Sequence, residues 1–349
     1  MLNRKNFLKR AGLLSGAVIT SPLWPFFTQQ SIANTIIDLH AHPGLFFRKD
    51  MDMYPGDQAL NQRLADIKNT GVKVVFMSLV ADSPLLVRTP TGIEVKGSFA
   101  KGDGWTEFQK QLKFFNDLII TQGFSVINSY RAIDTTTTKI LLTCEGGDFL
   151  DGDVNNIEKA YNSGLRSIQL VHYAQNNLGD LQTQPAVYNG LSNFGKSVTK
   201  RMNELGMVID VAHASFKTVA DVAEITTAPI ILSHSILKAE ADRPIAIRAI
   251  TPDHAKLVAQ TGGVIGAWPS GFSFNIEDFA NNTMRLIDLV GVEHVGLGTD
   301  MDANFKPVIT SYSEIKTWAE LLESKGLSKT EVNKILGGNA QRVLKQVLD

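Results

Sequence analysis

Eight short apolar runs of strand length recur along the chain, and each is followed by a stretch with helical spacing. Most of them are apolar at successive positions, as is typical of parallel strands that are buried on both faces. The repeated order of strand and helix predicts an α/β fold of the (β/α)8, or TIM, barrel type. The runs cover residues 35–40, 72–79, 139–145, 165–172, 206–213, 228–234, 262–268 and 294–300.

Capping signals mark several of the helices predicted between these runs. Apolar residues within 191–205 keep a spacing of three or four, and Gly206 is placed to end that helix. Thr251 followed by Pro252 is typical of a helix start, and the segment 328–331 (SKTE) has the pattern of a capping box. An open doubly wound sheet is the alternative architecture, but it usually carries a glycine-rich nucleotide loop that this sequence lacks.

One long segment, residues 81–104, separates the second apolar run from its helix. It holds four glycines and two prolines. The sequence leaves open whether this segment is a lid over an active site or a surface loop.

The first 33 residues differ from the rest of the chain. Four basic residues precede the apolar region 11–27, and Ser31-Ile32-Ala33 offers a small-x-small cleavage site. This order is typical of a secretory signal peptide, and "RKNFLK" is similar to a twin-arginine export motif with Lys5 in the second arginine's place. We therefore expect residues 1–33 to be removed, residues 34–349 to form a single barrel domain, and the protein to be exported to the bacterial periplasm or beyond.

The composition is that of an ordinary globular protein, with 44% hydrophobic and 20% charged residues and a formal charge of -1. This charge gives no reason to expect a nucleic-acid partner. Two prolines in the apolar N-terminal region argue against a stable membrane span. We expect a small-molecule substrate, and the sequence leaves a homodimer open.

Histidine and carboxylate side chains gather at the C-terminal ends of the apolar runs, the rim where TIM barrels place their chemistry. Residues two apart in a strand face the same side, so the first two histidines would present their imidazoles together. His254, in the first turn of a predicted helix, and His294, at the start of a run, are expected to be structural or solvated. The strand-end residues are His40, His42, Glu145, His172, His213, His234 and Asp300.

This set of side chains predicts two divalent metal ions as cofactors, with Zn²⁺ favoured. Imidazoles bind zinc well, and a carboxylate can bridge two ions. Paired ions about 3.5–4 Å apart can hold a nucleophilic hydroxide between them. Asp300 could take a proton from that water and pass it to the leaving group, and His172 could donate to a developing oxyanion. Asp302 is the alternative carboxylate for this proton transfer, but we expect its hydrogen bonds to be made with solvent.

The ordered motifs resemble those of the membrane (renal) dipeptidase family, peptidase family M19, in the amidohydrolase superfamily. "DLHAHPG" is similar to the family's D-G-H-x-D segment, "CEGG" to its glutamate-glycine-glycine segment, and "LVHYAQN" to its L-T-H-x-x-x-N. "GMVIDVAHAS" and "PIILSHS" resemble its two histidine strands. "GLGTDMDA" resembles G-I-G-S-D-x-D-G, and "GGNAQRVL" resembles the C-terminal G-G-N-x-x-R-V. The resemblance spans most of the chain after residue 33.

The resemblance implies a set of metal ligands. His40 and His42 would bind one zinc ion, Glu145 would bridge the pair, and His213 and His234 would bind the other. His42 stands where the family has aspartate. A neutral ligand in place of an anionic one should make the site more positive.

The resemblance also implies roles toward the substrate. His172 would contact the substrate carbonyl, Arg248 would bind the terminal carboxylate, and Asp300 would move the proton. Ala249 replaces the asparagine that follows the family's arginine, and the loop before it is longer than usual. Arg243 is therefore an alternative to Arg248 for binding the terminal carboxylate of the substrate.

The function that these observations predict is that of a binuclear zinc dipeptidase. The alternatives are another metal-dependent barrel hydrolase, such as an N-acyl amino acid deacylase or a TatD-like nuclease, and a non-catalytic exported protein that binds metal or peptide. His172, the export signal and the absence of basic clusters weigh against a nuclease. Asp300 weighs against a pure binding site, which needs no proton shuttle.

Overall fold

Eight parallel strands close into a barrel in the computed structural model, which describes residues 35–44, 54–89, 92–134, 136–239 and 242–349. The strands pair in the order β1, β2, β6, β7, β8, β9, β10, β11 and back to β1. The predicted TIM barrel is confirmed, because each of the eight apolar runs overlaps one barrel strand. The predicted signal peptide, residues 1–33, lies outside the described residues.

The barrel strands are mostly shorter than the apolar runs that predicted them. Additional short strands lie outside the barrel, where β5 pairs with the start of β6, and β3 pairs antiparallel with β4. The strands are β1 (Ile36–Ala41), β2 (Val72–Val80), β3 (Leu86–Thr89), β4 (Gly92–Val95), β5 (Ser125–Val126), β6 (Lys139–Glu145), β7 (Ser167–Gln169), β8 (Val208–Asp210), β9 (Ile231–Ser235), β10 (Val264–Ala267) and β11 (Val295–Leu297).

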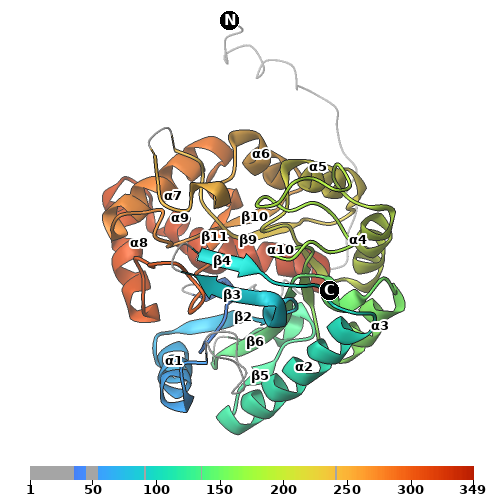
Figure 1. The fold of residues 1–349 in the computed structure, drawn as a ribbon. Coiled ribbons are helices and arrows are strands. Elements are labelled where there is room, and N and C mark those ends of the chain that lie inside the picture. Colours follow the sequence, from blue (N-terminus) through green and yellow to red (C-terminus); the bar gives the residue numbers. More distant parts are fainter. Residues whose placement is uncertain (1–34, 45–53, 90–91, 135, 240–241) are drawn as a thin grey trace, which may run out of the picture. The chain divides into compact units, whose positions relative to one another are not determined.

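Helices surround the strands (Figure 1). Buried aliphatic and aromatic side chains fill the layer between the strands and these helices, which is the larger core of the protein. The described helices are α1 (Asp57–Asn69), α2 (Asp103–Gln122), α3 (Asn155–Asn162), α4 (Asn193–Leu205), α5 (Phe216–Ile225), α6 (Pro252–Gln260), α7 (Ile276–Val290), α8 (Ile315–Ser324), α9 (Lys329–Asn333) and α10 (Asn339–Leu348).

The capping patterns in the sequence act as predicted. Gly206 ends α4 in the left-handed conformation with φ +65°, which glycine adopts at little cost. The Thr251 side chain accepts a hydrogen bond from the His254 backbone N–H at the start of α6. Ser328 and Glu331 form the capping box of α9. These local signals therefore fix helix ends independently of the barrel.

The C-terminal helix closes one end of the barrel. Val343, Leu344 and Val347 of α10 pack in a second hydrophobic cluster with inward-facing strand residues such as Leu39 and Phe76. This packing leaves the opposite end, where the strands finish, for polar groups. The end closed by α10 is thus the stable base of the barrel, as is usual for this fold.

The segment 81–104 forms a hairpin over the open end of the barrel. Figure 1 shows β3 and β4 lying across the barrel opening. Leu86, Ile93 and Val95 of the hairpin pack with Val80 and Tyr173, so one face of the hairpin is turned toward the barrel. Of the two interpretations that the sequence left open, this arrangement favours a lid.

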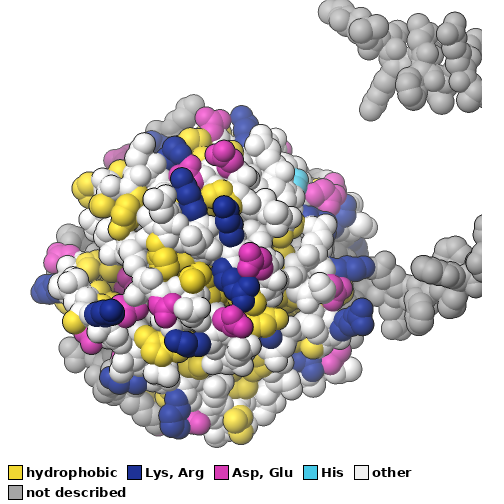
Figure 2. All heavy atoms as spheres, turned by 90° about the vertical axis from the view of Figure 1, so that its right-hand side faces the viewer, with side chains coloured by type: hydrophobic (Ala, Val, Ile, Leu, Met, Phe, Trp, Pro, Cys, Tyr) yellow, Lys and Arg dark blue, Asp and Glu magenta, His cyan; other side chains and the backbone are white. Residues whose placement is uncertain are grey.

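The surface seen in Figure 2 carries basic and acidic side chains that are interspersed, with hydrophobic side chains in small separate groups. This mixed surface agrees with the small net charge of the chain. Among the described helices, none is both long and apolar enough to cross a membrane.

Candidate functional site

The predicted site residues all lie at the open end of the barrel. His40 and His234 belong to β1 and β9, and Glu145 is the last residue of β6. His213 and Asp300 instead lie three residues beyond β8 and β11, in turns where both adopt a left-handed backbone with φ +64° and +53°. Such a conformation is uncommon for residues other than glycine and is concentrated at functional sites.

Two buried carboxylates fix the segments that carry these side chains. Asp38 in β1 accepts hydrogen bonds from the backbone N–H groups of His40 (3.2 Å) and Thr299 (2.9 Å), which ties the first histidine to the loop after β11. Asp210 in β8 accepts a hydrogen bond from the backbone N–H of Ser233 in β9 (3.0 Å). Burial raises the pKa of both carboxyls, against the lowering effect of their hydrogen-bond donors. These contacts define the positions from which the histidines project.

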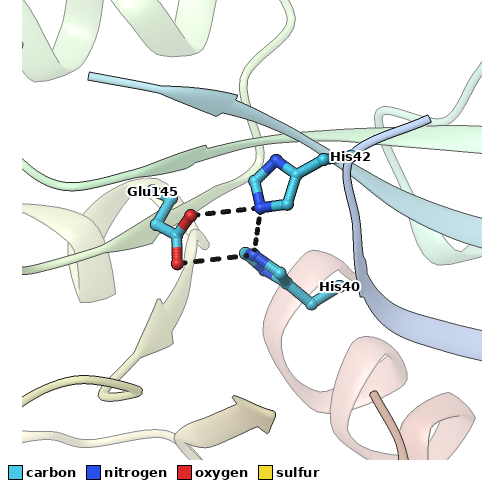
Figure 3. Close-up of side chains that lie close together, drawn as sticks. All are labelled: His40, His42 and Glu145. Carbon is cyan, nitrogen blue, oxygen red and sulfur yellow. Dashed lines mark hydrogen bonds and ion pairs between the residues drawn. The ribbon is translucent and has the colours of Figure 1, made fainter. Parts of the chain in front are cut away.

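The first group of converging side chains consists of His40, His42 and Glu145 (Figure 3). The two Nε2 atoms lie 2.9 Å apart. The carboxylate faces them, with Oε1 3.6 Å from His40 Nε2 and Oε2 3.1 Å from His42 Nε2. All three residues are buried. The predicted pairing of two imidazoles at the end of β1 is therefore present.

The second group shares the same carboxylate. His213 and His234 direct their Nε2 atoms at each other across 3.2 Å, and these atoms lie 3.2 and 3.8 Å from Glu145 Oε1. Burial and the charge of Arg248 hold the pKa of His213 well below its usual range, and burial and the charge of His40 do the same for His234. These two imidazoles are therefore neutral, the form that binds a metal ion, whereas against the lowering effect of burial the Glu145 carboxylate raises the pKa of His40 to about 9.

The donor set fits divalent metal ions. Glu145 lies between two histidine pairs, and within each group the ligand atoms fall within 4.8 Å of one another. Burial would raise the pKa of Glu145, but the charges of His172 and His40 hold it well below its usual range, so it is an anion. Four imidazole nitrogens around a buried carboxylate are a typical environment for zinc or a similar ion.

His172 lies beside this cluster and is oriented by a residue that the sequence analysis missed. Asp82 Oδ1 lies 2.6 Å from His172 Nδ1, and its Oδ2 accepts hydrogen bonds from the backbone N–H groups of Tyr173 (3.1 Å) and Ala174 (2.8 Å). The other ring nitrogen, Nε2, is 3.4 Å from Glu145 Oε2. Asp82 follows the end of β2 by two residues, so the same strand-end rule would have found it.

Asp300 lies between the cluster and a cavity. Its Oδ1 is 3.6 Å from His42 Nε2, and its Oδ2 accepts a hydrogen bond from the Trp268 indole at 3.2 Å. Burial raises the pKa of Asp300 to about 6, against the charges of His42 and His40, which lower it. Trp268 also lies just beyond a strand end, but a tryptophan at such a position does not by itself indicate a functional role.

The cavity has a volume of about 350 Å³ and is bounded by the β3–β4 hairpin. Asp300, Trp268 and Arg248 all line it. The Arg248 side chain is buried, lies over the Trp268 ring with 5.7 Å to the centroid, and donates a hydrogen bond to Gln182 Oε1 at 2.7 Å. A buried guanidinium in an enclosed cavity next to the cluster suits an anionic group of a ligand.

The rival arginine is engaged elsewhere. Arg243 forms a two-pronged ion pair with Asp278 at the start of α7, with Nη2 3.2 Å from Oδ1, and its guanidinium lies over the Phe274 ring. Arg243 is not among the residues that line the cavity. Of the two candidates, the geometry thus favours Arg248 for contact with a substrate.

The expectation for Asp302 was wrong. Its carboxylate accepts hydrogen bonds from Arg63 Nη2 (2.6 Å) and Nε (2.9 Å) and from the Gly44 backbone N–H (2.9 Å), so protein groups rather than solvent satisfy it. The ion pair connects the loop after β11 to α1. Short-range sequence patterns do not reveal this contact because Arg63 and Asp302 are far apart along the chain.

The two histidines set aside as structural lie away from the cluster. His254 is buried in the first turn of α6, beside the Phe216 ring. His294 lies just before β11, at the opposite end of the barrel, where its Nδ1 contacts the Gly263 carbonyl at 2.9 Å.

Comparison with known proteins gives a consistent result. The pattern of the family described as "Membrane dipeptidase (Peptidase family M19)" matches residues 29–349. The chain is 28% identical to dipeptidase 3 of Mus musculus over 227 residues, which are 61% of this chain and 45% of the mouse protein. It is 28% identical to a dipeptidase of Claviceps purpurea over 220 residues, 60% of this chain and 51% of that protein. The chain thus spans about half the length of these curated relatives.

Solved structures show the same fold at low sequence identity. A metallo peptidase from Rhodobacter sphaeroides, solved with a phosphinate mimic of the dipeptide L-Ala-D-Ala, has a TM-score of 0.74 and 17% identity, covering 90% of this chain and 99% of that one. A probable dipeptidase from Pseudomonas aeruginosa has a TM-score of 0.72 and 18% identity, covering 90% and 95%.

Proposed function

Since the chain belongs to the membrane dipeptidase family, peptidase family M19, we propose that it is a metal-dependent dipeptidase with two zinc ions as cofactors. The observation that carries this proposal is the position of Glu145 between two histidine pairs, next to the cavity that Asp300 and Arg248 line. A carboxylate shared in this way suits two ions better than one.

The chain's own residues divide between metal binding and substrate handling. His40, His42 and Glu145 would hold one ion, and Glu145, His213 and His234 the other. Bound divalent ions supply Lewis-acid activation of the substrate carbonyl and of water. The fixed imidazoles and the buried carboxylate would supply the ligand atoms for these ions.

Asp300 moves the proton in this proposal. Its Oδ1 faces the histidine cluster, whereas its Oδ2 is held by the Trp268 indole. The carboxylate can therefore accept a proton from water at one oxygen while its orientation is kept by the other. The same oxygen then returns the proton to the departing amine. General acid–base groups of this kind typically contribute about 10²–10⁴ in rate.

His172 and Arg248 position the substrate. Asp82 fixes the His172 ring so that Nε2 points at the cluster, where it stabilises the oxygen of the scissile carbonyl. Arg248 binds the terminal carboxylate of the dipeptide with its planar guanidinium. A cavity of about 350 Å³ is of the size that encloses a small molecule.

The test is metal content together with hydrolysis of dipeptides. Purified protein loaded with zinc should contain about two ions per chain by elemental analysis and should release amino acids from dipeptides. His213→Ala should lose metal and activity together. His294→Gln, a change at a histidine outside the cluster, is the matched control and should keep both. A zinc content near zero in the loaded protein would refute the proposal.

We also propose that the protein is exported and that residues 1–33 are removed, on the basic, apolar, small-x-small order of the N-terminus alone.

A further inference from the structure

The hairpin that covers the cavity carries an arginine on its inward face. Side chains two apart in a strand share a face, and so do residues directly opposite each other in an antiparallel pair. Arg88 is two residues from Leu86 and is directly opposite Ile93. Leu86 and Ile93 pack toward the barrel, so Arg88 stands on the same side and lines the cavity. The Arg88 side chain is exposed, so it stands at the solvent edge of the cavity, where its guanidinium can contact a ligand.

A second exposed cation, Lys306, also lines the cavity. Lys306 belongs to the loop that follows Asp300, and it has a left-handed backbone with φ +43°. The loop is held in place because the Gly271 N–H donates to the Phe305 carbonyl at 2.7 Å and the Val308 N–H donates to the Pro269 carbonyl at 2.9 Å. A side chain at Gly271 would collide with this loop, since its Cβ would lie 2.8 Å from the Phe305 oxygen.

The charges that line the cavity do not balance. Arg88, Arg248 and Lys306 face it, whereas Asp300 is the only acid among the described lining residues. Within the described chain, no acidic side chain pairs with Arg88 or Lys306. The acid nearest to Lys306 in sequence, Asp302, is committed to Arg63. The cavity therefore has an excess of positive charge that a neutral dipeptide, with one ammonium and one carboxylate group, does not match.

We propose that this cavity selects dipeptides that carry a second carboxylate, in an aspartate or glutamate side chain. This inference rests on the proposed function. Arg248 takes the terminal carboxylate at the buried wall, and Arg88 and Lys306 take the side-chain carboxylate nearer the solvent. Arginine binds carboxylates with two parallel hydrogen bonds, and lysine adds a point charge.

The test compares matched substrates on zinc-loaded full-length protein. Ala-Glu is compared with Ala-Gln, and Glu-Ala with Gln-Ala, since each pair differs by one charge with nearly the same shape. The two pairs distinguish a carboxylate on the C-terminal residue from one on the N-terminal residue. For at least one pair we expect kcat/KM of the acidic dipeptide to exceed that of its amide by about three- to tenfold, as two partly hydrated charge pairs would give. This ratio should decrease as salt is added.

Substitutions assign the preference to the two cations. Arg88→Gln and Lys306→Gln should each move the acid-to-amide ratio toward one. Lys200→Gln removes the same charge from an exposed position on α4 and should leave the ratio and the activity unchanged. If amide and acidic dipeptides are hydrolysed equally well, or if Arg88→Gln and Lys306→Gln both leave the ratio intact, the inference is overturned while the proposed function stands. If the zinc-loaded protein hydrolyses none of the four dipeptides, the proposed function fails.

Discussion

Asp300 and Asp302 are neighbouring carboxylates to which the structure gives different surroundings, and the substitution Asp300→Asn separates their roles. The amide keeps the shape of the side chain, and its oxygen can still accept the Trp268 indole N–H, now made at 3.2 Å. The amide cannot accept a proton from water at neutral pH. Turnover of a dipeptide should therefore fall by about 10²–10⁴-fold. Substrate binding should change much less, because Arg248 is unaltered.

Asp302→Asn is the matched control, with the opposite expected result. Asp302 accepts three hydrogen bonds from Arg63 and one from the Gly44 N–H. The amide loses the charge that Arg63 pairs with, and both side chains are largely shielded from solvent, at 17% and 22% exposed. We expect a loss of about 1–2 kcal/mol in the free energy of unfolding, the usual cost of weakening charge-assisted hydrogen bonds. Turnover of the folded protein should stay within a few-fold of the original.

Steady-state kinetics on the zinc-loaded variants give kcat and KM, and urea unfolding gives the free energy of unfolding. We expect a large kinetic effect at Asp300 with little change in stability, and the reverse at Asp302. If Asp300→Asn kept near-normal turnover while Asp302→Asn abolished it, Asp302 rather than Asp300 would be the residue that transfers the proton.

Three further outcomes are expected. Asp82→Ala should lower kcat more than it raises KM, because His172 loses the partner that orients it. Asp82→Asn keeps a polar group beside the ring and should recover part of the lost kcat. Equal effects of the two variants in steady-state kinetics would argue against an orienting role. Burial and the charge of Arg248 lower the pKa of His254 to about 4, so the folded state favours the neutral imidazole. The resulting contribution to the free energy of unfolding is fully present above pH 6.5 and is lost as the pH falls toward 4. From pH 8 to pH 5, the free energy of unfolding measured in urea should fall by about 2 kcal/mol more for the original chain than for His254→Gln. An equal fall in both proteins would contradict this expectation. Mass spectrometry of the exported protein should find Asn34 at the N-terminus, whereas an intact Met1 would indicate a membrane anchor.

The barrel was predictable from the sequence because its strands lie in largely apolar runs, and the alternation of such runs with helical spacing fits few folds. The grouping of most residues in the candidate site was predictable for a related reason. A barrel gathers its strand ends at one rim, so residues as distant in sequence as His40 and His234 could be grouped before any contact was known.

The parts that could not be predicted depend on contacts between distant segments. Nothing near Asp302 in the sequence indicates Arg63 as its partner. Whether Arg243 or Arg248 faces the cavity depends on Asp278 in α7, which engages the first of them. The lid was ambiguous because its strands are short and only one face of the hairpin is apolar, so the pattern alone did not reveal what that face covers.

His42 links the metal cluster to the proposed substrate preference. The resemblance to the dipeptidase family places an aspartate here, and imidazole brings no negative charge. Besides the two groups that share Glu145, the ligand atoms of His40, His234 and Asp300 also lie within 4.8 Å of one another. Glu145 and Asp300 are then the acids in the potential metal-binding groups found among the described residues. The cluster is therefore one charge more positive than its aspartate counterpart, beside a cavity that already has excess cations. His42→Asp should lower the ratio of kcat/KM for acidic over amide dipeptides by about threefold, the order expected for one added charge that is strongly screened by water. Metal content, measured on the same samples, distinguishes a change in substrate preference from a loss of the metal ions. A ratio that His42→Asp leaves unchanged, in protein that retains its metal, would show that the charge of the cluster does not reach the side-chain carboxylate.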